Sequence, residues 1–310
     1  MVPVYSREAV LSAVSPHDAY DAVRDAFVAH HRGDWTMPPK VYVTNYPAGD
    51  FRAMPALGGG HALLKWVTSF PGNPTRGLPT VTGVVLLSNA ETGTLEAVLD
   101  AASVTALRTA AAGVLAVDTL AGETSSVAVV GCGANGAETA RMLAARGIAP
   151  VVWDVDTDRC ASVADELGAR VADSLGQALA CDAVITVTPG NEVLYGPGSL
   201  RPGQHVSLMG ADGPGKAEVA VEELARGRLF CDDWEQASHG GELTGAVAAG
   251  AVAREDVTTL GAVLADDAEG RRDDAETTLF DSTGLAIQDL AIARLAFLRS
   301  AELDLPRIAL

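Results

Sequence analysis

The pattern of apolar and polar positions changes part-way along the chain. After about residue 124, short apolar runs alternate with segments of helical periodicity, and the runs fall at 125–131, 150–153, 183–188, 204–209, 228–231 and 277–280. Short apolar runs that alternate with helices are typical of buried parallel strands. The pattern therefore predicts an α/β fold, a Rossmann doubly wound parallel sheet, over residues 111–285.

The amino-terminal part follows a different pattern. A helix is predicted over residues 17–31, and strands are predicted at 41–45, 63–68 and 80–87, with turns rich in Gly and Pro between them. This succession predicts an α+β domain over residues 1–110. The chain ends in a segment that is apolar at helical spacing, and we expect this helix, within residues 286–310, to pack against the first domain and complete it.

Length and composition narrow the class of protein. A chain of 310 residues is long enough for two domains. No apolar run approaches 18 residues and no charged start precedes an apolar segment, so we expect a soluble cytoplasmic protein that does not enter membranes. The net charge of −18 would repel nucleic acid. The four cysteines form no CxxC or Cys/His cluster, so we expect no metal site and no disulfides.

A glycine-rich segment lies between the first apolar run and the helix that follows it. The segment reads Gly131-Cys-Gly133-Ala-Asn-Gly136. In a strand, turn and helix of this kind, the first glycine permits the sharp turn, the second lets the backbone approach a pyrophosphate, and the third lets helix and strand pack closely. The context predicts a dinucleotide site, to which we also assign Ala134, Asn135 and Thr188.

The next predicted strand ends at an acidic residue that we expect in the same site. Asp154 lies 23 residues beyond Gly131, close to the spacing at which a carboxylate accepts from the adenosine ribose. Such a carboxylate would repel a 2′-phosphate, which favours NAD over NADP. Arg159 could instead reach a 2′-phosphate, so NADP remains the alternative cofactor.

Positive charge is distributed unevenly between the two basic residue types. Only three lysines accompany nineteen arginines, and they are Lys40, Lys65 and Lys216. A lysine is a compact charge whose pKa can be moved, whereas an arginine clamps a carboxylate with a two-pronged fork. Lys40, Lys65, Arg52 and Arg108 could therefore form a site for an organic acid. The alternative is ordinary surface pairing in an acidic protein.

Several longer motifs carry a resemblance to a known family. They occur in this order: Arg52-Ala-Met-Pro, Lys65-Trp-Val-Thr-Ser-Phe-Pro-Gly-Asn-Pro, Gly77-Leu-Pro-Thr80, Leu107-Arg-Thr-Ala-Ala and Gly210-Ala-Asp-Gly-Pro-Gly-Lys216. This order resembles the ornithine cyclodeaminase and mu-crystallin family. Two further segments, 232–242 and 280–289, are most similar to its archaeal-type alanine dehydrogenase branch.

The resemblance implies roles for individual residues. Lys65 is expected beside the reacting carbon, and Asp212 is expected to face the amine or imine nitrogen. Arg108 is expected to hold the substrate carboxylate, helped by further residues that contact the substrate, namely Lys40, Arg52 and Thr80. Lys216 is expected to be structural and to pair with Glu218 or with the loop backbone. The third glycine is often Ala in relatives, and Gly136 leaves cofactor binding intact.

The resemblance also implies an activity. The expected reaction is NAD(H)-dependent interconversion of a small 2-oxo acid, through its imine with ammonia or an amine, and an L-amino acid, as in alanine dehydrogenase. The alternatives are an ornithine or lysine cyclodeaminase, a ketimine or iminosuccinate reductase, and a ligand-binding protein like mu-crystallin. Relatives are dimers through the first domain, so a homodimer is expected.

Overall fold

Two units make up the chain in a computed structural model, which describes residues 1–213 and 215–310. The first unit comprises Met1–Arg108 and Leu285–Leu310, and the second comprises Thr109–Gly284. The long helix α3 (Ala101–Leu120) begins in the first unit and continues into the second.

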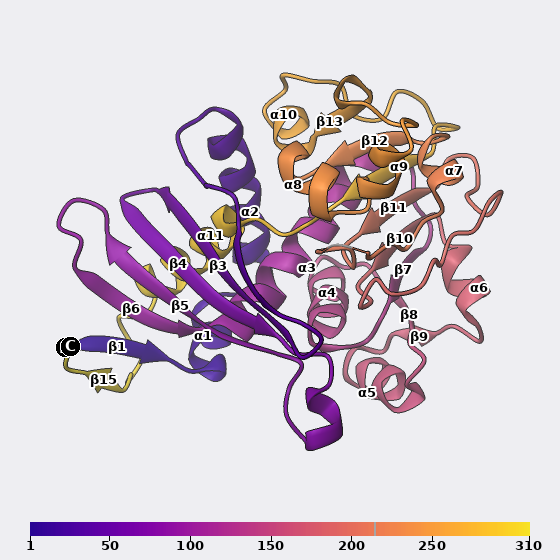
Figure 1. The fold of residues 1–310 in the computed structure, drawn as a ribbon. Helices are drawn as coiled ribbons and strands as arrows, with labels where there is room; N and C mark the ends of the chain where they lie inside the picture. Colours follow the sequence, from indigo (N-terminus) through magenta and orange to yellow (C-terminus); the bar gives the residue numbers. More distant parts are fainter. Residues whose placement is uncertain (214) are drawn as a thin grey trace. The chain divides into compact units, whose positions relative to one another are not determined.

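The first unit is built on a mixed sheet (Figure 1). Within the described part of the chain the strand order is β15 (Arg307–Ile308), β1 (Val2–Tyr5), β6 (Leu95–Asp100), β5 (Val81–Asn89), β4 (His61–Ser69), β3 (Gly49–Gly58), β2 (Val41–Asn45). Neighbouring strands are antiparallel except for β1 and β6, which run parallel. Because β1 pairs with β15, the two ends of the chain lie side by side.

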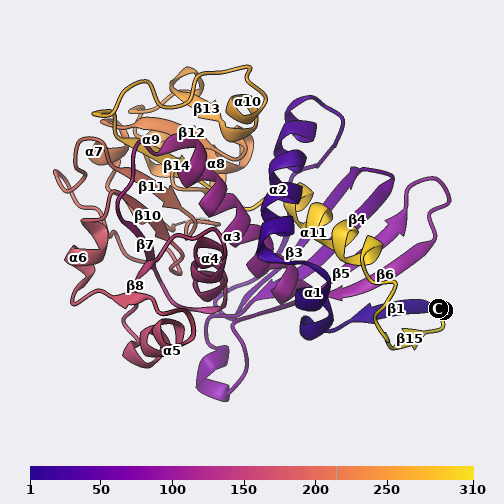
Figure 2. The same cartoon turned by 180° about the vertical axis from the view of Figure 1, so that it is seen from behind.

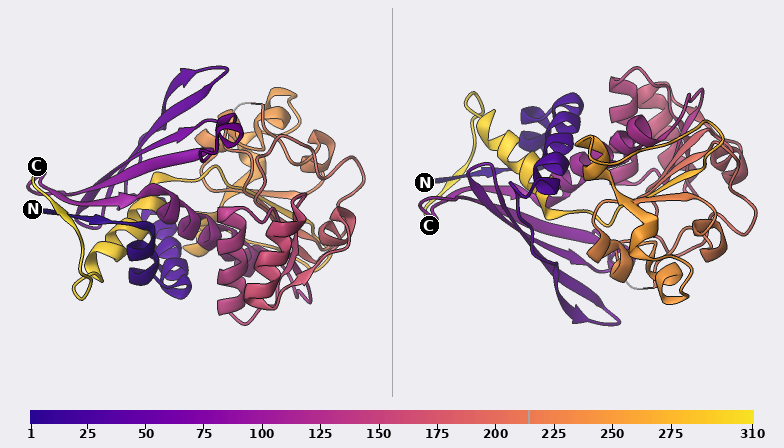
Figure 3. Two further views of the ribbon diagram at one scale, coloured as in Figure 1. Left: turned by 90° about the horizontal axis from the view of Figure 1, so that it is seen from below. Right: turned by 90° about the horizontal axis from the view of Figure 1, so that it is seen from above.

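Helices cover one face of this sheet. They are α1 (Arg7–Ala13), α2 (Pro16–His31) and α11 (Ala286–Leu298), and a short 3-10 helix, η1 (Asn73–Arg76), precedes β5. The helix α2 begins where the sequence predicts, because the Ser15 hydroxyl accepts from the Asp18 N–H and Pro16 occupies the first turn. Figures 2 and 3 show α2 and α11 on the same side of the strands.

The two faces of the sheet differ in burial, as the alternation along β4 shows. Leu63, Lys65 and Val67 are buried on the helix-covered face, whereas Leu64 and Trp66 are exposed on the other. Cross-strand pairing places Val41 and Val43 of β2 on the same outer face as Trp66. This outer face therefore presents apolar side chains to the surroundings.

The sequence pattern missed β3, which lies inside the sheet. Its Pro55 has no N–H for a ladder hydrogen bond, and proline disfavours an interior strand. The partner β2 pairs with β3 only as far as Ala53, and the next bridge joins Thr36 to Leu57. Pro55 thus falls in the gap between two stretches of pairing, where its missing N–H leaves no acceptor unsatisfied.

The second unit contains the parallel sheet that the sequence predicts. Within the described residues its order is β13 (Val257–Thr259), β12 (Arg228–Cys231), β14 (Thr278–Asp281), β11 (His205–Leu208), β10 (Ala183–Thr186), β7 (Val127–Val130), β8 (Val151–Trp153), β9 (Arg170–Val171). All neighbouring pairs are parallel. The order reverses at β7 and β10, which is the switch point of a Rossmann fold, so the predicted fold class is confirmed.

Helices flank this sheet on both faces (Figure 3). They are α4 (Ala134–Ala145), α5 (Thr157–Leu167), α6 (Leu175–Leu179), α7 (Val221–Leu224), α8 (Trp234–Gly240), α9 (Thr244–Ala248), α10 (Leu260–Leu264) and the 3-10 helix η2 (Arg254–Asp256). The central strands β7, β10, β11 and β14 are buried throughout, as expected for strands covered on two sides, whereas the edge strand β9 is exposed. All four cysteines are buried and free.

One helix among the described residues is long and apolar enough to cross a membrane. It is α3, and 78% of its most apolar window is buried inside the protein. A core helix of a globular protein passes the same test of length and composition.

Candidate active site

Lys65 is the most enclosed cation of the first unit. Lys65 is only 2% exposed, because the alternation of side chains along β4 places it on the face covered by α11. The ammonium donates to both carboxylate oxygens of Asp289, at 2.9 and 3.0 Å, and to the Thr105 hydroxyl at 3.1 Å. The amino group is therefore oriented and shielded from solvent.

Burial changes the protonation of this lysine. Loss of hydration lowers the pKa of Lys65 to about 8, while the Asp289 carboxylate opposes the shift and the charges of Arg108 and Lys40 add to it. A pKa near working pH is what a group that exchanges protons requires.

Arg108 lies on α3 next to the same carboxylate. Its Nε is 3.4 Å from Asp289 Oδ1, and one terminal nitrogen donates to the Gln288 side-chain oxygen at 3.3 Å. Gln288 also accepts from the Leu285 N–H and so closes the first turn of α11. The start of α11 thus holds both Lys65 and Arg108.

Arg52 lies on β3, and strand pairing places it on the same face of the sheet as Lys65. Its guanidinium forms two bonds with Asp50, 2.6 Å from Nε to Oδ1 and 3.3 Å from a terminal nitrogen to Oδ2, and it lies over the Tyr42 ring at 5.4 Å. These contacts fix the direction of the guanidinium.

The two remaining substrate candidates lie at strand ends. Lys40 is half-buried immediately before β2, and its positive charge lowers the pKa of Lys65. Thr80 is half-buried immediately before β5, and its backbone oxygen accepts from the Phe70 N–H at 2.8 Å. The first unit thus carries Lys40, Arg52, Lys65 and Arg108 on or beside one sheet.

The glycine-rich turn of the second unit fits a pyrophosphate. Gly131 has φ +102°, and a Cβ there would lie 2.7 Å from the Val187 oxygen; a Cβ on Gly136 would lie 1.7 Å from the Gly131 oxygen. Gly133 faces open space and caps α4 without any side-chain hydrogen bond. The first N–H groups of α4, beginning at Ala134 and Asn135, are therefore available to an anion.

Asp154 lies at the carboxyl end of β8, where the sequence places it. Its carboxylate accepts from the Cys132 N–H at 2.6 Å and from the Asp156 N–H at 2.8 Å, which ties it to the glycine-rich turn. A carboxylate has further lone pairs for ribose hydroxyls. Arg159 pairs with Asp156 at 3.1 Å, so this arginine already has an acidic partner.

Thr188, the last cofactor candidate, is held by a buried acid. Its hydroxyl donates to Glu218 at 2.5 Å and accepts from the Gly190 N–H at 3.0 Å. Glu218 also accepts from the Thr186 hydroxyl and the Gly210 N–H, and burial raises its pKa. These bonds fix the loop after β10 at the carboxyl edge of the sheet.

Asp212 is half-buried in the loop after β11, four residues before Lys216. Lys216 donates to its carboxylate at 2.5 Å. The expectation that Lys216 pairs with Glu218 is wrong, because Glu218 is enclosed by hydroxyl and N–H donors and Lys216 contacts Asp212 instead. The motif that contains both residues spans residue 214, which lies outside the described residues.

Sequence reasoning missed the acidic partners of the cations. They are Asp50 beside Arg52 and Asp289 beside Lys65 and Arg108. A signal for Asp289 exists, because Gln288-Asp289 interrupts an otherwise apolar helix from Leu285 to Ile292. A buried polar pair in such a helix needs partners.

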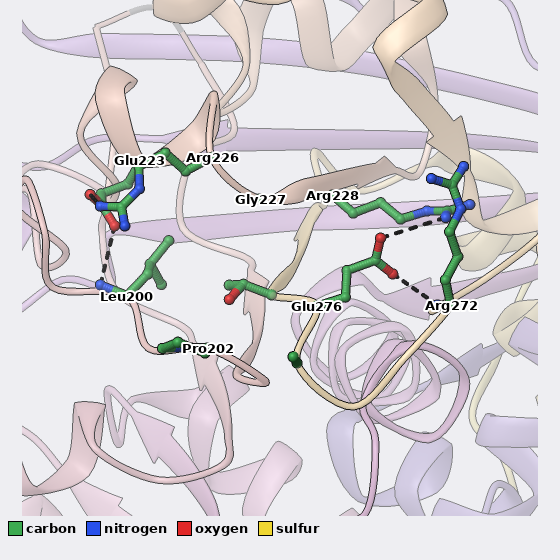
Figure 4. Close-up of a pocket in the computed structure, with 10 residues that line it drawn as sticks. Leu200, Pro202, Glu223, Arg226, Gly227, Arg228, Arg272 and Glu276 are labelled. Atoms are coloured by element: carbon green, nitrogen blue, oxygen red, sulfur yellow. Dashed lines mark hydrogen bonds and ion pairs between the residues drawn. The ribbon is translucent and has the colours of Figure 1, made fainter.

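A cavity of about 460 Å³ lies elsewhere on the second unit (Figure 4). Its lining residues come from the amino ends of β12 and β14 and from nearby loops, at the sheet edge opposite the glycine-rich turn. Its charges are paired: Glu276 lies 3.7 Å from Arg228, and Glu223 lies 3.0 Å from Arg226. No predicted site residue lines it.

The ornithine cyclodeaminase/mu-crystallin family matches residues 3–302. The chain belongs to this family. The resemblance drawn from the motifs is thereby confirmed.

Individual family members are similar over nearly the whole chain. An alanine dehydrogenase from Archaeoglobus fulgidus is 41% identical over 302 residues, covering 95% of this chain and 94% of that protein. An iminosuccinate reductase from Paracoccus denitrificans is 31% identical over 312 residues, covering 94% of each. A solved archaeal alanine dehydrogenase dimer with bound NAD matches with a TM-score of 0.92 and 39% identity, covering 99% of this chain and 98% of that one.

Proposed function

We propose that this protein is an NAD(H)-dependent oxidoreductase that interconverts a small 2-oxo acid plus ammonia and an L-amino acid, with pyruvate and L-alanine as the first candidates. The observation that carries the proposal is the buried Lys65 in contact with Asp289, in a unit that carries three other cations on or beside the same sheet. The 41% identity to an alanine dehydrogenase over 95% of the chain supports the choice of substrate.

The cations of the first unit suit an anionic substrate. In a protein of net charge −18, an organic acid needs locally placed positive charge. We assign the substrate carboxylate to Arg108, whose fork can bind two oxygens, with Lys40, Arg52 and Thr80 as further contacts. Asp50 would keep the Arg52 guanidinium in one direction before the substrate arrives.

We assign proton handling and charge stabilisation to Lys65 and Asp212. Conversion of an imine to an amine adds a hydride to carbon and a proton to nitrogen, and it passes through positive charge on nitrogen. The carboxylate of Asp212, at the carboxyl edge of the parallel sheet, is suited to stabilise that charge. Lys65, with a pKa of about 8, is suited to donate a proton during amination and to accept one during the reverse reaction.

The glycine-rich turn is the proposed cofactor site. NADH, when bound there, supplies the hydride. Gly131, Gly133, Ala134, Asn135 and Gly136 would hold the pyrophosphate through backbone groups, Asp154 would accept from the ribose, and Thr188 would border the site. NAD rather than NADP is the proposed cofactor, because Asp154 would repel a 2′-phosphate and Arg159 already pairs with Asp156.

The apolar outer face of the first unit suits a homodimer. Val41 is 57% exposed, Val43 is 51% exposed and Trp66 is 38% exposed, and they lie on one side of a continuous sheet. Exposed apolar patches of this kind mark interfaces. We propose that a second copy covers this face, and the matched archaeal alanine dehydrogenase is itself a dimer. Residues 1–110 with 286–310 would then form the substrate-binding and dimerisation domain of a cytoplasmic enzyme, and residues 111–285 the dinucleotide-binding domain.

A panel of 2-oxo acids tests the proposal. The purified protein is incubated with each acid, with ammonium or methylamine, and with NADH or NADPH, and the absorbance of the reduced cofactor is followed. We expect consumption of NADH that requires both the oxo acid and the amine, fastest with pyruvate. Absence of consumption with every pair would refute the proposal, and consumption only with a four-carbon dicarboxylic acid would instead favour an iminosuccinate reductase.

A further inference from the structure

Asp289 has a place in the first unit that the family comparison does not explain. It is fully buried in the first turn of α11, and both of its carboxylate oxygens accept a hydrogen bond from the Lys65 ammonium, at 2.9 and 3.0 Å. The same Oδ1 lies 3.4 Å from Arg108 Nε. One carboxylate therefore contacts both cations to which the proposed function assigns chemistry.

The ammonium of Lys65 is oriented by its neighbours. A lysine has three N–H donors, and they meet the Asp289 carboxylate and the Thr105 hydroxyl. Thr105 donates its own hydrogen to the Ala101 oxygen at 2.6 Å, so its lone pairs face the lysine. The direction of the Cε–Nζ bond is thus fixed by contacts from two helices.

Stability alone is a poor explanation for this arrangement. A buried ion pair loses hydration on both partners, and well-packed apolar residues often stabilise as much or more. The remainder of the α11 segment from Leu285 to Ile292 is apolar apart from Gln288, which itself contacts Arg108. The two polar residues of this segment, Gln288 and Asp289, are therefore those that reach the two cations.

We propose that Asp289 is a positioning residue, which holds the Lys65 ammonium and the Arg108 guanidinium in a fixed relation and supplies the negative charge that keeps Lys65 protonated. The proposal deepens the proposed function and rests on it for its kinetic consequences. Its effect on Lys65 itself exists without any substrate.

The charges around Lys65 determine the direction of the effect. Asp289 on α11 is the negative neighbour, Arg108 on α3 and Lys40 before β2 are the positive neighbours, and Thr105 on α3 is neutral. Burial, Arg108 and Lys40 lower the pKa of Lys65, and Asp289 raises it. Removing this charge leaves a buried ammonium beside two cations, so the lysine should lose its proton at lower pH.

The small number of lysines permits a direct test. Protein labelled with ¹³C and ¹⁵N in lysine side chains has only Lys40, Lys65 and Lys216 to resolve, and Lys40→Arg and Lys216→Arg variants assign the signals. We expect the wild-type Lys65 signal to titrate near pH 8 and the Asp289→Asn signal to titrate at least about one unit lower. Equal midpoints in the two proteins would overturn the proposal.

A matched control separates this effect from the loss of any buried acid. Glu223 is also buried and also pairs with an arginine, but it lies in the second unit at the amino edge of the sheet. Glu223→Gln should leave the Lys65 titration unchanged. A Lys65 shift of equal size in that variant would show a general disturbance and would overturn the assignment to Asp289.

Asp289→Glu keeps the negative charge and is the second variant. It also provides the test if Asp289→Asn does not fold. Its longer side chain should hold the Lys65 titration within about half a unit of wild type while moving the ammonium, so kcat should fall at least about tenfold. An unchanged kcat would overturn positioning. If no oxo acid is turned over by the wild type, the proposed function fails while the lysine titrations still decide the part played by Asp289.

Discussion

Replacing Gly136 by Ala tests the geometry on which cofactor binding is argued. A Cβ at this position would lie 1.7 Å from the Gly131 oxygen and 2.8 Å from the Gly131 carbonyl carbon. Both atoms belong to the backbone, so no side chain can rotate away, and either the turn or the start of α4 must move. Forcing extra volume into a packed site costs about 1–3 kcal/mol.

That cost converts into a measurable change in melting temperature. For a unit of this size, 1 kcal/mol shifts Tm by about 2–4 °C, so Gly136→Ala should lower Tm by about 2–12 °C. Because the Gly131 turn moves, the affinity for NADH should fall as well. Calorimetry measures the first effect, and titration of NADH fluorescence measures the second.

Gly133→Ala is the matched control. Gly133 has φ −68°, and a Cβ there would meet no atom within 4 Å. We expect Tm to change by less than about 2 °C, because two effects oppose each other. Alanine caps a helix less well than glycine, which destabilises the folded state, but it also lowers the entropy of the unfolded chain, which favours folding. The new methyl group would enter the space where a pyrophosphate approaches, so affinity for NADH should fall at least about tenfold. An unchanged Tm in Gly136→Ala, or unchanged NADH affinity in Gly133→Ala, would refute the reasoning.

Three further predictions concern protonation and assembly. Lys65 has a pKa of about 8, so the rate of amination, which needs the protonated lysine, should fall above about pH 8, and the rate of the reverse reaction should rise there. In initial-rate assays Lys65→Arg should abolish most of the activity and this pH dependence. Burial raises the pKa of Glu242 from 4.5 to about 8, so the folded state binds this proton more tightly and the free energy of unfolding falls as pH rises between those values. In urea unfolding at pH 5 and pH 8, Glu242→Gln should remove up to about 3–5 kcal/mol of that fall. A fall in the variant equal to that of the wild type would contradict this. Trp66→Glu on the outer face should yield a folded monomer by light scattering while Trp66→Phe stays dimeric, and a dimeric Trp66→Glu protein would contradict the proposed interface.

Local signals in the sequence were sufficient for six strands of the parallel sheet but not for its short edge strands, β9 and β13. The strands β7 and β10 are runs of apolar and β-branched residues, and the turn between β7 and α4 needs glycine for steric reasons that are visible in the motif itself. In contrast, β3 escaped the pattern because Pro55 argues against a strand, and only the pairing of its neighbours makes the proline tolerable.

The charged site was predictable in part. The scarcity of lysine and the motifs around Lys65 and Arg108 pointed to these cations. Their shared partner could not be found from spacing, because Asp289 lies 224 residues from Lys65 along the chain. Likewise, the pairing of Lys216 with Asp212 rather than Glu218 depends on how the loop folds and on the donors that surround Glu218. Long-range partners of this kind are set by the tertiary structure.

The central claim is that this protein couples oxidation of NADH to the formation of an L-amino acid from a 2-oxo acid and ammonia. The most direct measurement is the stoichiometry of the reaction with pyruvate, ¹⁵N-labelled ammonium and NADH, in which oxidised cofactor and labelled L-alanine are both quantified. The account predicts one labelled alanine for each NADH consumed, and neither product with Lys65→Arg. Formation of NAD without a labelled amino acid, or turnover of ornithine or lysine to a cyclic product with no net change in NADH, would contradict it.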